Sequence, residues 1–407
     1  MKRISVFFRF AFCVLCLFVF SISAAAINGD VNNDGNVSVL DSKAVLEFAA
    51  GTKTPTAEEL LSADTNHDGY VTTDDAREIL RAASAIITLS EHQYTEWVTV
   101  QKVTCTEEGI ESSTCTTCNK EFHKITEPTG HKPENGVCVN CNKLLTNKYI
   151  EYNSKKLPFE CTDTQMIELI GEPQDTINDK FFKRNADIYV YYTDYTDLVI
   201  FTFVDGALTQ FVSYDSEARV VYEEKNFCVE NVSDEATEYD NLTITGYFDR
   251  TGKIPEAYAI GVVFNKSYAY EVNKLNNSAS EKIILHLTNG LRAINGLNVL
   301  EFCTVASDVA RGHSKDMAEN GYFDHVNLDG KTSADRMRDG GINWWICGEN
   351  IAAGYIDPYI VIEDWYNSPG HRTNILEERF ERLGVGVVYD YSSDYRVYLT
   401  QNFYSSF

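Results

Sequence analysis

The chain has 407 residues, of which 44% are hydrophobic, and its 60 acidic side chains outnumber 35 basic ones, giving a formal net charge of -25. This acidic balance argues against a nucleic-acid-binding protein, which needs a basic surface to neutralise phosphates. The length allows about two to four domains of about 100 to 200 residues each. The hydrophobic share is that of a folded protein, so the acidity is not that of a disordered tail.

The first residues predict export. Three basic residues, Lys2, Arg3 and Arg9, precede an apolar run at 10–22 that ends in small residues. This order is typical of a secretory signal peptide, and we expect residues 1–26 to be removed. The run is shorter than the about 18 to 20 residues of a spanning helix, and no later stretch is apolar enough to cross a bilayer. We therefore expect a secreted protein without a transmembrane segment after signal removal.

Residues 27–86 contain the same twelve-residue pattern twice, with acidic or amide side chains at alternate positions and glycine at the sixth. Calcium prefers about six to eight oxygen ligands, which a short loop supplies from positions 1, 3, 5, 7, 9 and 12. We therefore predict that this region binds two calcium ions, one in each copy. The ligands would be Asp30, Asn32, Asp34, Asn36, Ser38 and Asp41 in the first copy, and Asp64, Asn66, Asp68, Tyr70, Thr72 and Asp75 in the second.

A helical pattern follows each loop, and no matching helix is expected before either one. Two such loop–helix copies resemble a type I dockerin, the module by which exported bacterial proteins bind a cohesin on a scaffold protein. The resemblance implies an all-α, calcium-dependent fold and a cohesin partner that contacts loop positions 10 and 11. These positions hold Val39 and Leu40 in the first copy but Thr73 and Asp74 in the second, so the two copies are chemically unlike.

Residues 91–145 are expected to form a small cysteine-rich module. Two Cys-x-x-Cys pairs lie 19 residues apart: Cys115, Cys118, Cys138 and Cys141. Such pairs are typical of a structural zinc site, and Cys105 with His131 offers a different zinc set with the first pair. In an exported protein the same cysteines could instead form disulfides, so zinc and disulfides both stay open. Either would stabilise a segment too small for a core of its own.

Residues 149–273 are expected to form an α+β domain with a structural role. Thr162 and Gln165 make a capping box that begins a short helix. Strand-like runs follow at 188–192, 198–204, 208–214 and within 242–270. No cluster of catalytic residue types stands out in this region. It resembles the domain that often precedes secreted bacterial CAP domains.

Residues 275–407 begin with two amphipathic helical patterns and end with two strand-like runs. Between them stand three motifs: Tyr322-Phe-Asp-His325, Gly348-Glu349-Asn350-Ile351 and Trp365-Tyr-Asn-Ser368-Pro369-Gly370-His371-Arg372. In this order they resemble the CAP superfamily, named for cysteine-rich secretory proteins and plant pathogenesis-related proteins, in its bacterial form. The resemblance implies a C-terminal α-β-α sandwich. The whole chain is therefore expected to be a multidomain α+β protein.

The CAP resemblance also implies a cleft lined by two histidines and two acidic residues. The histidines would be His325 and His371, and the first acid Glu349. The second acid is missing, because Ser368 stands where eukaryotic members carry glutamate. Helical spacing directs Ser368 toward the cleft, whereas Asp364 is expected to point elsewhere.

The cleft trio is compatible with more than one chemistry. Two imidazoles and a carboxylate suit a divalent metal such as zinc, or general acid–base catalysis. The resemblance favours a scaffold-docked protein that binds a lipid, peptide or polymer ligand. It leaves open whether the chain is an enzyme. The alternatives are a metal-assisted hydrolase or protease acting on extracellular polymers, and a passive accessory of a cellulosome-like, polysaccharide-degrading complex. All three place the chain outside the cell, or at its surface through a scaffold.

Two further features of this region are expected to be structural. His313 lies on an apolar helical stripe, which is more typical of a core histidine than of a ligand. Cys303 and Cys347 are one pair that could form a disulfide, although spacing in sequence does not fix their distance.

Overall fold

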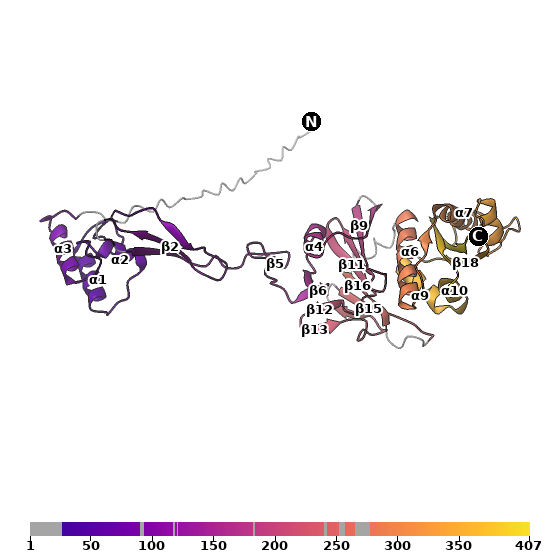
Figure 1. Ribbon diagram of the computed structural model, residues 1–407, viewed down its shortest axis with the longest axis horizontal. Coiled ribbons are helices and arrows are strands. Elements are labelled where there is room, and N and C mark those ends of the chain that lie inside the picture. Colours follow the sequence, from indigo (N-terminus) through magenta and orange to yellow (C-terminus); the bar gives the residue numbers. More distant parts are fainter. Residues whose placement is uncertain are drawn as a thin grey trace, which may run out of the picture. The chain divides into compact units, whose positions relative to one another are not determined.

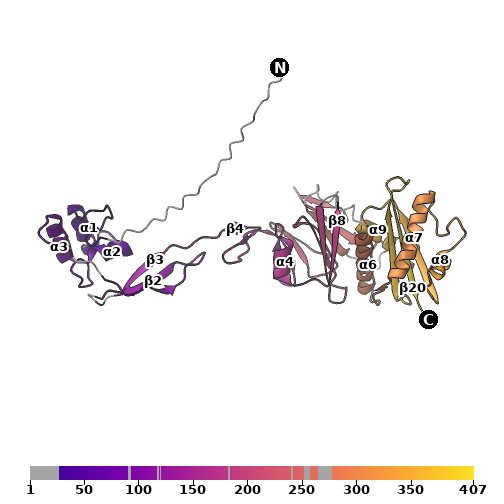
Figure 2. The ribbon, with the colours of Figure 1, turned by 90° about the horizontal axis from the view of Figure 1, so that it is seen from above.

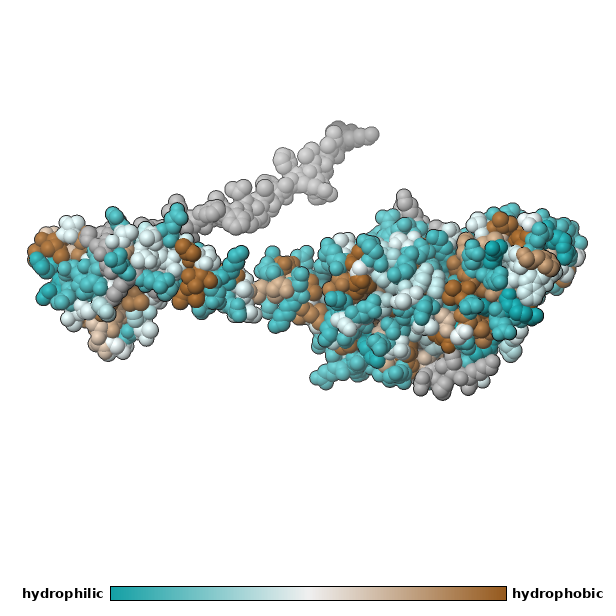
Figure 3. Space-filling model, viewed as in Figure 1, coloured by the Kyte–Doolittle hydropathy of each residue, from teal (hydrophilic) through white to brown (hydrophobic). Residues whose placement is uncertain are grey.

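A computed structural model of the chain describes most of its length, in two compact units at Met1–His131 and Lys132–Phe407 that are taken separately (Figure 1). The described residues are 27–89, 93–116, 119, 121–181, 184–239, 242–251, 257–264 and 277–407. The predicted signal peptide and Cys118 lie outside them. No helix in this described part is both long and apolar enough to span a bilayer. The face seen in Figure 3 is mostly hydrophilic, in keeping with the acidic composition.

The first unit pairs a small helical module with a three-stranded antiparallel sheet. Its elements are α1 (Val39–Ala49), α2 (Ala57–Ala63), α3 (Thr73–Ala83), β1 (Val98–Gln101), β2 (Gly109–Thr114) and β3 (Glu121–Thr126). A capping box begins each of the three helices, and α1 packs on α3 around Val45, Phe48 and Ile79. The expectation that no helix precedes the second loop is wrong, because α2 ends at Ala63, directly before that loop.

The second unit opens with a hairpin, a four-stranded sheet and a seven-stranded antiparallel sheet. The first two comprise β4 (Pro133–Glu134), β5 (Val137–Cys138), β6 (Lys148–Tyr152), β7 (Lys155–Pro158), β12 (Arg219–Tyr222) and β13 (Lys225–Phe227), with α4 (Asp163–Ile170) after β7. The large sheet has the order β14-β15-β16-β11-β10-β9-β8. Its strands are β8 (Asp175–Phe181), β9 (Arg184–Tyr191), β10 (Val199–Val204), β11 (Ala207–Ser213), β14 (Thr237–Tyr239), β15 (Leu242–Phe248) and β16 (Ala257–Phe264).

The C-terminal part is a four-stranded sheet between two helical layers. Its elements are α6 (Asn277–Ile294), β17 (Glu301–Phe302), α7 (Thr304–Asn320), α8 (Ser333–Asp339), β18 (Ile346–Ala353), α9 (Pro358–Asn367), α10 (Pro369–Ile375), β19 (Arg382–Tyr389) and β20 (Val397–Ser405). The strand order is β17-β19-β20-β18. Figure 2 shows α6 and α9 on one side of this sheet and α7 and α8 on the other, an α-β-α arrangement.

Alternation along β19 explains how helices pack on both faces of that sheet. Val385 and Val387 belong to the core that includes α6 and α9, whereas Gly384 and Gly386 face α7. A Cβ atom at Gly386 would lie 2.0 Å from the backbone nitrogen of Arg311 in α7. Glycine is therefore what lets α7 lie directly against the strand.

Both faces of the seven-stranded sheet are buried, and one of them packs against the C-terminal sandwich. Phe201 and Phe203 of β10 lie in the core formed with the four-stranded sheet and α4. Ile200, from the same strand, lies in a second core together with Leu287 of α6 and Trp365 of α9. Successive side chains of a strand point to opposite faces, so an almost wholly apolar strand can fill two cores. The two regions that the sequence predicts as separate domains thus share a core.

Two buried polar contacts join the same two regions. His286 of α6 contacts the Asp175 carboxylate through Nε2 at 3.1 Å and the Tyr195 hydroxyl through Nδ1 at 3.0 Å. Arg372 of α10 donates two hydrogen bonds to Asp249, which follows β15, at 2.9 and 2.8 Å. The Asp249 side chain is fully buried. Burial opposes its ionisation, but hydrogen bonds from Thr251 and Arg372 outweigh burial and hold the pKa of Asp249 below its usual value.

We expect Asp249→Asn to lower the free energy of unfolding by about 3 to 5 kcal/mol, because it leaves the Arg372 cation buried without a counter-charge. Denaturant unfolding of the full chain, followed by tryptophan fluorescence, measures this change. The pKa of Asp249 is lower in the folded state than in the unfolded state. The contribution of this carboxylate to the free energy of unfolding is therefore complete above about pH 3.9, the unfolded-state pKa, and is lost as pH falls through the lowered folded-state pKa.

The matched control is Glu301→Gln, which removes an ion pair with Arg382 whose side chains are 72% and 42% exposed. This exposed pair should contribute less than about 1 kcal/mol. Equal losses in the two variants would show that the Asp249 pair does not hold the second unit together.

Candidate functional site

The first acidic loop buries two carboxylates in a ring of backbone donors. Asp30 and Asp41 are 4% and 0% exposed. The backbone NH groups of Asp34 and Gly35 donate to Asp30 at 3.0 and 2.8 Å, and that of Asn32 donates to Asp41 at 2.9 Å. Gly35 has a φ of +88°, a conformation that other residues rarely adopt. Two buried carboxylates on one loop of this geometry fit a calcium ion.

The second loop repeats this arrangement. Asp64 and Asp75 are 1% and 0% exposed, and the Thr72 NH donates to Asp75 at 2.8 Å. Burial, and next the negative charge of Asp75, raise the pKa of Asp64. A cation between these carboxylates would relieve both effects, which fits calcium. The remaining predicted ligands lie in the same two loops: Asn32, Asp34, Asn36 and Ser38 in the first, and Asn66, Asp68 and Tyr70, besides Thr72, in the second.

The four residues predicted to contact a partner begin the helices α1 and α3, and all four are exposed. Val39 and Leu40 are 63% and 64% exposed, so the first copy presents an apolar surface. Thr73 and Asp74 make the corresponding surface of the second copy polar, and Asp74 forms an ion pair with Arg77 at 3.1 Å. The chemical difference expected from the sequence is therefore displayed on the surface.

One group of four metal-binding side chains is found among the described residues. The ligand atoms of Cys105, His131, Cys138 and Cys141 lie within 4.8 Å of one another, a donor set that suits structural zinc. Cys115 is not part of this group, and its predicted partner Cys118 lies outside the described residues, so the four-cysteine set stays a prediction. The alternative zinc set correctly combined Cys105 with His131. It added Cys115 and Cys118 to them, whereas the group in the structure contains Cys138 and Cys141. Spacing in the sequence could not decide which Cys-x-x-Cys pair accompanies Cys105 and His131, because either pair supplies two thiolates from one tight turn.

Glu349 of β18 is the most firmly held member of the predicted cleft trio. Its Oε1 contacts His325 Nδ1 at 2.8 Å, and its Oε2 accepts a hydrogen bond from Arg336 of α8. Arg336 also donates to the His325 carbonyl oxygen at 2.9 Å. Both carboxylate oxygens are therefore used within the protein. Glu349 orients His325 and, in the neutral imidazole, leaves Nε2 as the acceptor.

This hydrogen bond also changes the protonation of His325. The bond from Glu349 raises the pKa of His325, against the lowering effects of burial and of the Arg336 charge. The His325 side chain is 55% exposed, whereas that of Glu349 is 3% exposed. An exposed imidazole on a buried carboxylate can exchange protons with solvent or with a ligand.

His371 of α10 offers an atom that the protein leaves unused. Its Nδ1 is buried and has no hydrogen-bond partner in the described part of the chain. Burial, and next the charge of His325, lower the pKa of His371, so the two imidazoles influence one another. Within the described residues, however, the ligand atoms of His325, Glu349 and His371 do not meet within 4.8 Å as those of the cysteine group do.

A pocket of about 400 Å³ adjoins His371. Its lining comes from β18, from α9, from α10 and Ser368 before it, and from three loops: Ile351, Ala352, Ala353, Asp364, Trp365, His371, Ser368, Phe323, Tyr355 and Tyr395. Ser368 lines the pocket as predicted. The expectation that Asp364 points elsewhere is wrong, because Asp364 also lines the pocket and accepts a hydrogen bond from the Tyr355 hydroxyl at 2.6 Å. A second carboxylate is thus present, although not at the motif position.

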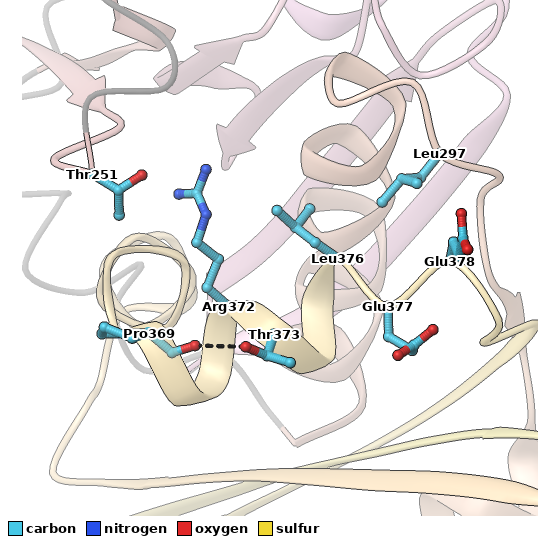
Figure 4. Close-up of a pocket in the computed structure, with 8 residues that line it drawn as sticks. All are labelled: Thr251, Leu297, Pro369, Arg372, Thr373, Leu376, Glu377 and Glu378. Carbon is cyan, nitrogen blue, oxygen red and sulfur yellow. Dashed lines mark hydrogen bonds between the residues drawn. The ribbon is translucent and has the colours of Figure 1, made fainter.

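Another cavity, of about 510 Å³, lies beside α10 and lacks comparable chemistry (Figure 4). Its one cation, Arg372, is directed toward Thr251, away from Glu377 and Glu378. Arg372 is already paired with Asp249. Among the described residues that line it, this cavity therefore has neither a histidine nor an unpaired cation.

Arg336 and Tyr355 are site residues that the sequence did not indicate. Thr332 and Asp335 form a capping box that begins α8, so the helix carrying Arg336 was predictable, but its position over Glu349 was not. His313 is 1% exposed, and its Nε2 contacts the Asp324 carbonyl oxygen, although its Nδ1 has no partner in the described part of the chain. Cys303 and Cys347 do not form the disulfide that the sequence allows, and Cys303 instead accepts a hydrogen bond from the Tyr404 hydroxyl.

We expect a calcium chelator to unfold α1 and α3 reversibly, because it leaves repelling carboxylates buried in both loops. Far-ultraviolet circular dichroism of the full chain, before and after excess calcium is restored, measures the helix content. Asp41→Asn should reduce calcium binding from two ions to one, whereas the exposed, non-ligand Asp74→Asn should retain two. A spectrum indifferent to chelator would refute calcium-dependent folding.

We expect Glu349→Gln to lower the pKa of His325, because it removes the hydrogen bond and the charge that do most to raise it. An NMR titration of the imidazole measures it. In the wild type the His325–Glu349 pair stabilises the fold fully below about pH 6.5. This contribution is lost as pH rises through the raised pKa of His325. Glu319→Gln, at an exposed ion pair with Lys315, is the control. An unchanged His325 pKa in the Glu349 variant would rule out this coupling.

Several known proteins are similar to parts of the chain. An uncharacterized membrane protein YlbC of Bacillus subtilis (strain 168) is 42% identical over 138 residues, which are 34% of this chain and 38% of that protein. The uncharacterized protein YkwD of the same organism is 42% identical over 111 residues, which are 27% and 43% of the two chains. The chain thus spans about two fifths of the length of these curated relatives. A solved extracellular protein containing a SCP domain, from Bacillus anthracis str. Ames, is 22% identical with a TM-score of 0.46, over 60% of this chain and 93% of its own.

Two family patterns match the chain directly. That of the dockerin type I domain matches residues 28–82, which contain both acidic loops. That of the cysteine-rich secretory protein family, abbreviated CAP, matches residues 285–403, which contain His325, Glu349 and His371. A type I dockerin binds calcium and implies a cohesin partner. The chain therefore carries a type I dockerin domain and, at its C-terminal end, a CAP domain of the cysteine-rich secretory protein family.

Proposed function

We propose that the chain is exported, docks through its dockerin on a cohesin-bearing scaffold, and there presents a CAP cleft that binds a ligand. The observation that carries the cleft assignment is the buried, unpartnered Nδ1 of His371 beside a pocket of about 400 Å³. A buried polar atom without a partner is costly, so its retention favours a ligand that completes it. The signal-like residues 1–26 and the dockerin support the extracellular setting, a polysaccharide-degrading, cellulosome-like complex.

The cleft would bind its ligand from two sides. His325 Nε2, which Glu349 leaves outward, and His371 Nδ1 supply hydrogen-bonding groups. The adjoining pocket supplies apolar and aromatic walls, including Trp365 and Ile351. A ligand with both polar and apolar parts, such as a peptide, a lipid or a polymer fragment, matches this combination. A purely passive role for the CAP domain would leave these groups without a use.

A second candidate is a metal-assisted hydrolase or protease acting on extracellular polymers. The mutual influence of His325 and His371 favours it, because two neighbouring imidazoles can hold a divalent cation. A catalytic zinc site usually needs three protein ligands and one open position. Glu349 is a poor third ligand, since His325 and Arg336 use both of its oxygens. Ligand binding without a resident metal is therefore the function that the geometry favours.

Zinc titration of the full chain, held in calcium, tests this choice. We expect the wild type and the His325→Ala, His371→Ala double variant to bind the same number of zinc ions, those of the cysteine group of Cys105 and its neighbours. A loss of one equivalent in the double variant would overturn the metal-free cleft and favour the hydrolase. Asp308→Asn, an exposed change on α7, controls for unspecific loss. Thermal unfolding of each variant shows whether the domain stays folded.

A further inference from the structure

The lining of the pocket beside His371 is unusual in its chemistry. Four of its side chains are aromatic, Phe323, Tyr355, Trp365 and Tyr395, and one, Asp364, is a carboxylate. Among the described residues that line it, there is neither a lysine nor an arginine. An aromatic ring has a negative face, so rings and a carboxylate around one cavity create a negative potential.

The aromatic residues arrive from separate parts of the CAP domain. Trp365 belongs to α9, Tyr355 to the loop after β18, Phe323 to the loop after α7, and Tyr395 to the turn between β19 and β20. Phe323 and Tyr395 stay 45% and 51% exposed, with ring centroids 6.1 Å apart. Exposed aromatic side chains at the edge of a pocket are unfavourable in water and indicate a site that a ligand covers.

The carboxylate is held in place but not neutralised. The Tyr355 hydroxyl donates to Asp364 Oδ2 at 2.6 Å, which fixes the direction of the group. Within the described residues, Asp364 forms no ion pair, although six other aspartates of unit Lys132–Phe407 do. Its charge is thus available to a cation that enters the pocket.

We propose that this pocket binds an organic ammonium group, with the rings of Phe323, Tyr355 and Tyr395 around the cation and the Asp364 carboxylate as its counter-charge. The inference rests on the proposed ligand-binding cleft and names the chemical class of the ligand. Desolvated cation–π contacts are attractive, and they discriminate against a neutral group of equal size. The net charge of -25 would further attract cations to the protein.

Matched probes test the charge requirement. Choline and its uncharged isostere 3,3-dimethylbutan-1-ol have nearly the same shape, so calorimetric titration of each into the calcium-loaded full chain isolates the cation. Butylammonium against butan-1-ol repeats the comparison for a primary amine. Tighter binding of choline would indicate a quaternary ammonium ligand, and tighter binding of butylammonium a lysine-like amine. In the favoured series we expect the cation to bind at least about tenfold more tightly than the alcohol.

Two variants separate this inference from the proposed function. Asp364→Asn should weaken binding of the cation about tenfold and leave binding of the alcohol unchanged, whereas Asp308→Asn, the same change on the surface of α7, should alter neither. Equal binding of cation and alcohol would overturn the ammonium assignment but leave a ligand-binding cleft. If neither probe binds, the ammonium assignment is overturned as well. The zinc titration then decides the proposed function independently.

Discussion

The buried ion pair between Asp249 and Arg372 is the contact on which the geometry of the cleft depends. Arg372 directly follows His371 on α10, a helix of seven residues, so anchoring the guanidinium also anchors the short helix that carries His371. Arg372 lies over the Tyr366 ring as well, 3.8 Å from its centroid. A bidentate buried pair tolerates few alternative arrangements, which makes it a device for specificity even where its net energy is modest. The loop after β15 of the seven-stranded sheet thereby helps to position the helix that carries His371.

Within the cleft, the acidic groups have different tasks. Both carboxylate oxygens of Glu349 bind groups of the protein, His325 and Arg336. Glu349 therefore sets the orientation and the protonation of the His325 imidazole. Asp364 accepts its hydrogen bond from a neutral group, the Tyr355 hydroxyl, so its negative charge stays available to the pocket. For the proposed function, one carboxylate committed within the protein and one available to a ligand suit recognition better than hydrolysis, which would need a positioned water and a further activating group. The absence of glutamate at Ser368 is consistent with this division.

Local signals made much of the fold predictable, whereas long-range contacts were not. Capping boxes and apolar periodicity located the helices, and the two calcium loops follow from residue type and spacing, because their ligands lie within twelve residues. The error at Asp364 has a local cause: α9 ends at Asn367, and Ser368 is extended with φ -94° and ψ 122°, so helical spacing no longer relates the two side chains. Arg336 and the partner pair of Cys105 depend on contacts between distant segments, which no periodicity encodes.

The shared core changes what counts as a module in a chain of this kind. A recombination event that moved residues 277–407 alone would carry α6 and α9 into a new protein with Leu287 and Trp365 stripped of the sheet that covers them. It would also leave Asp249 behind. A segment that keeps both cores must therefore include β6 through β20, in which the β-rich part covers α6 and α9 of the CAP domain.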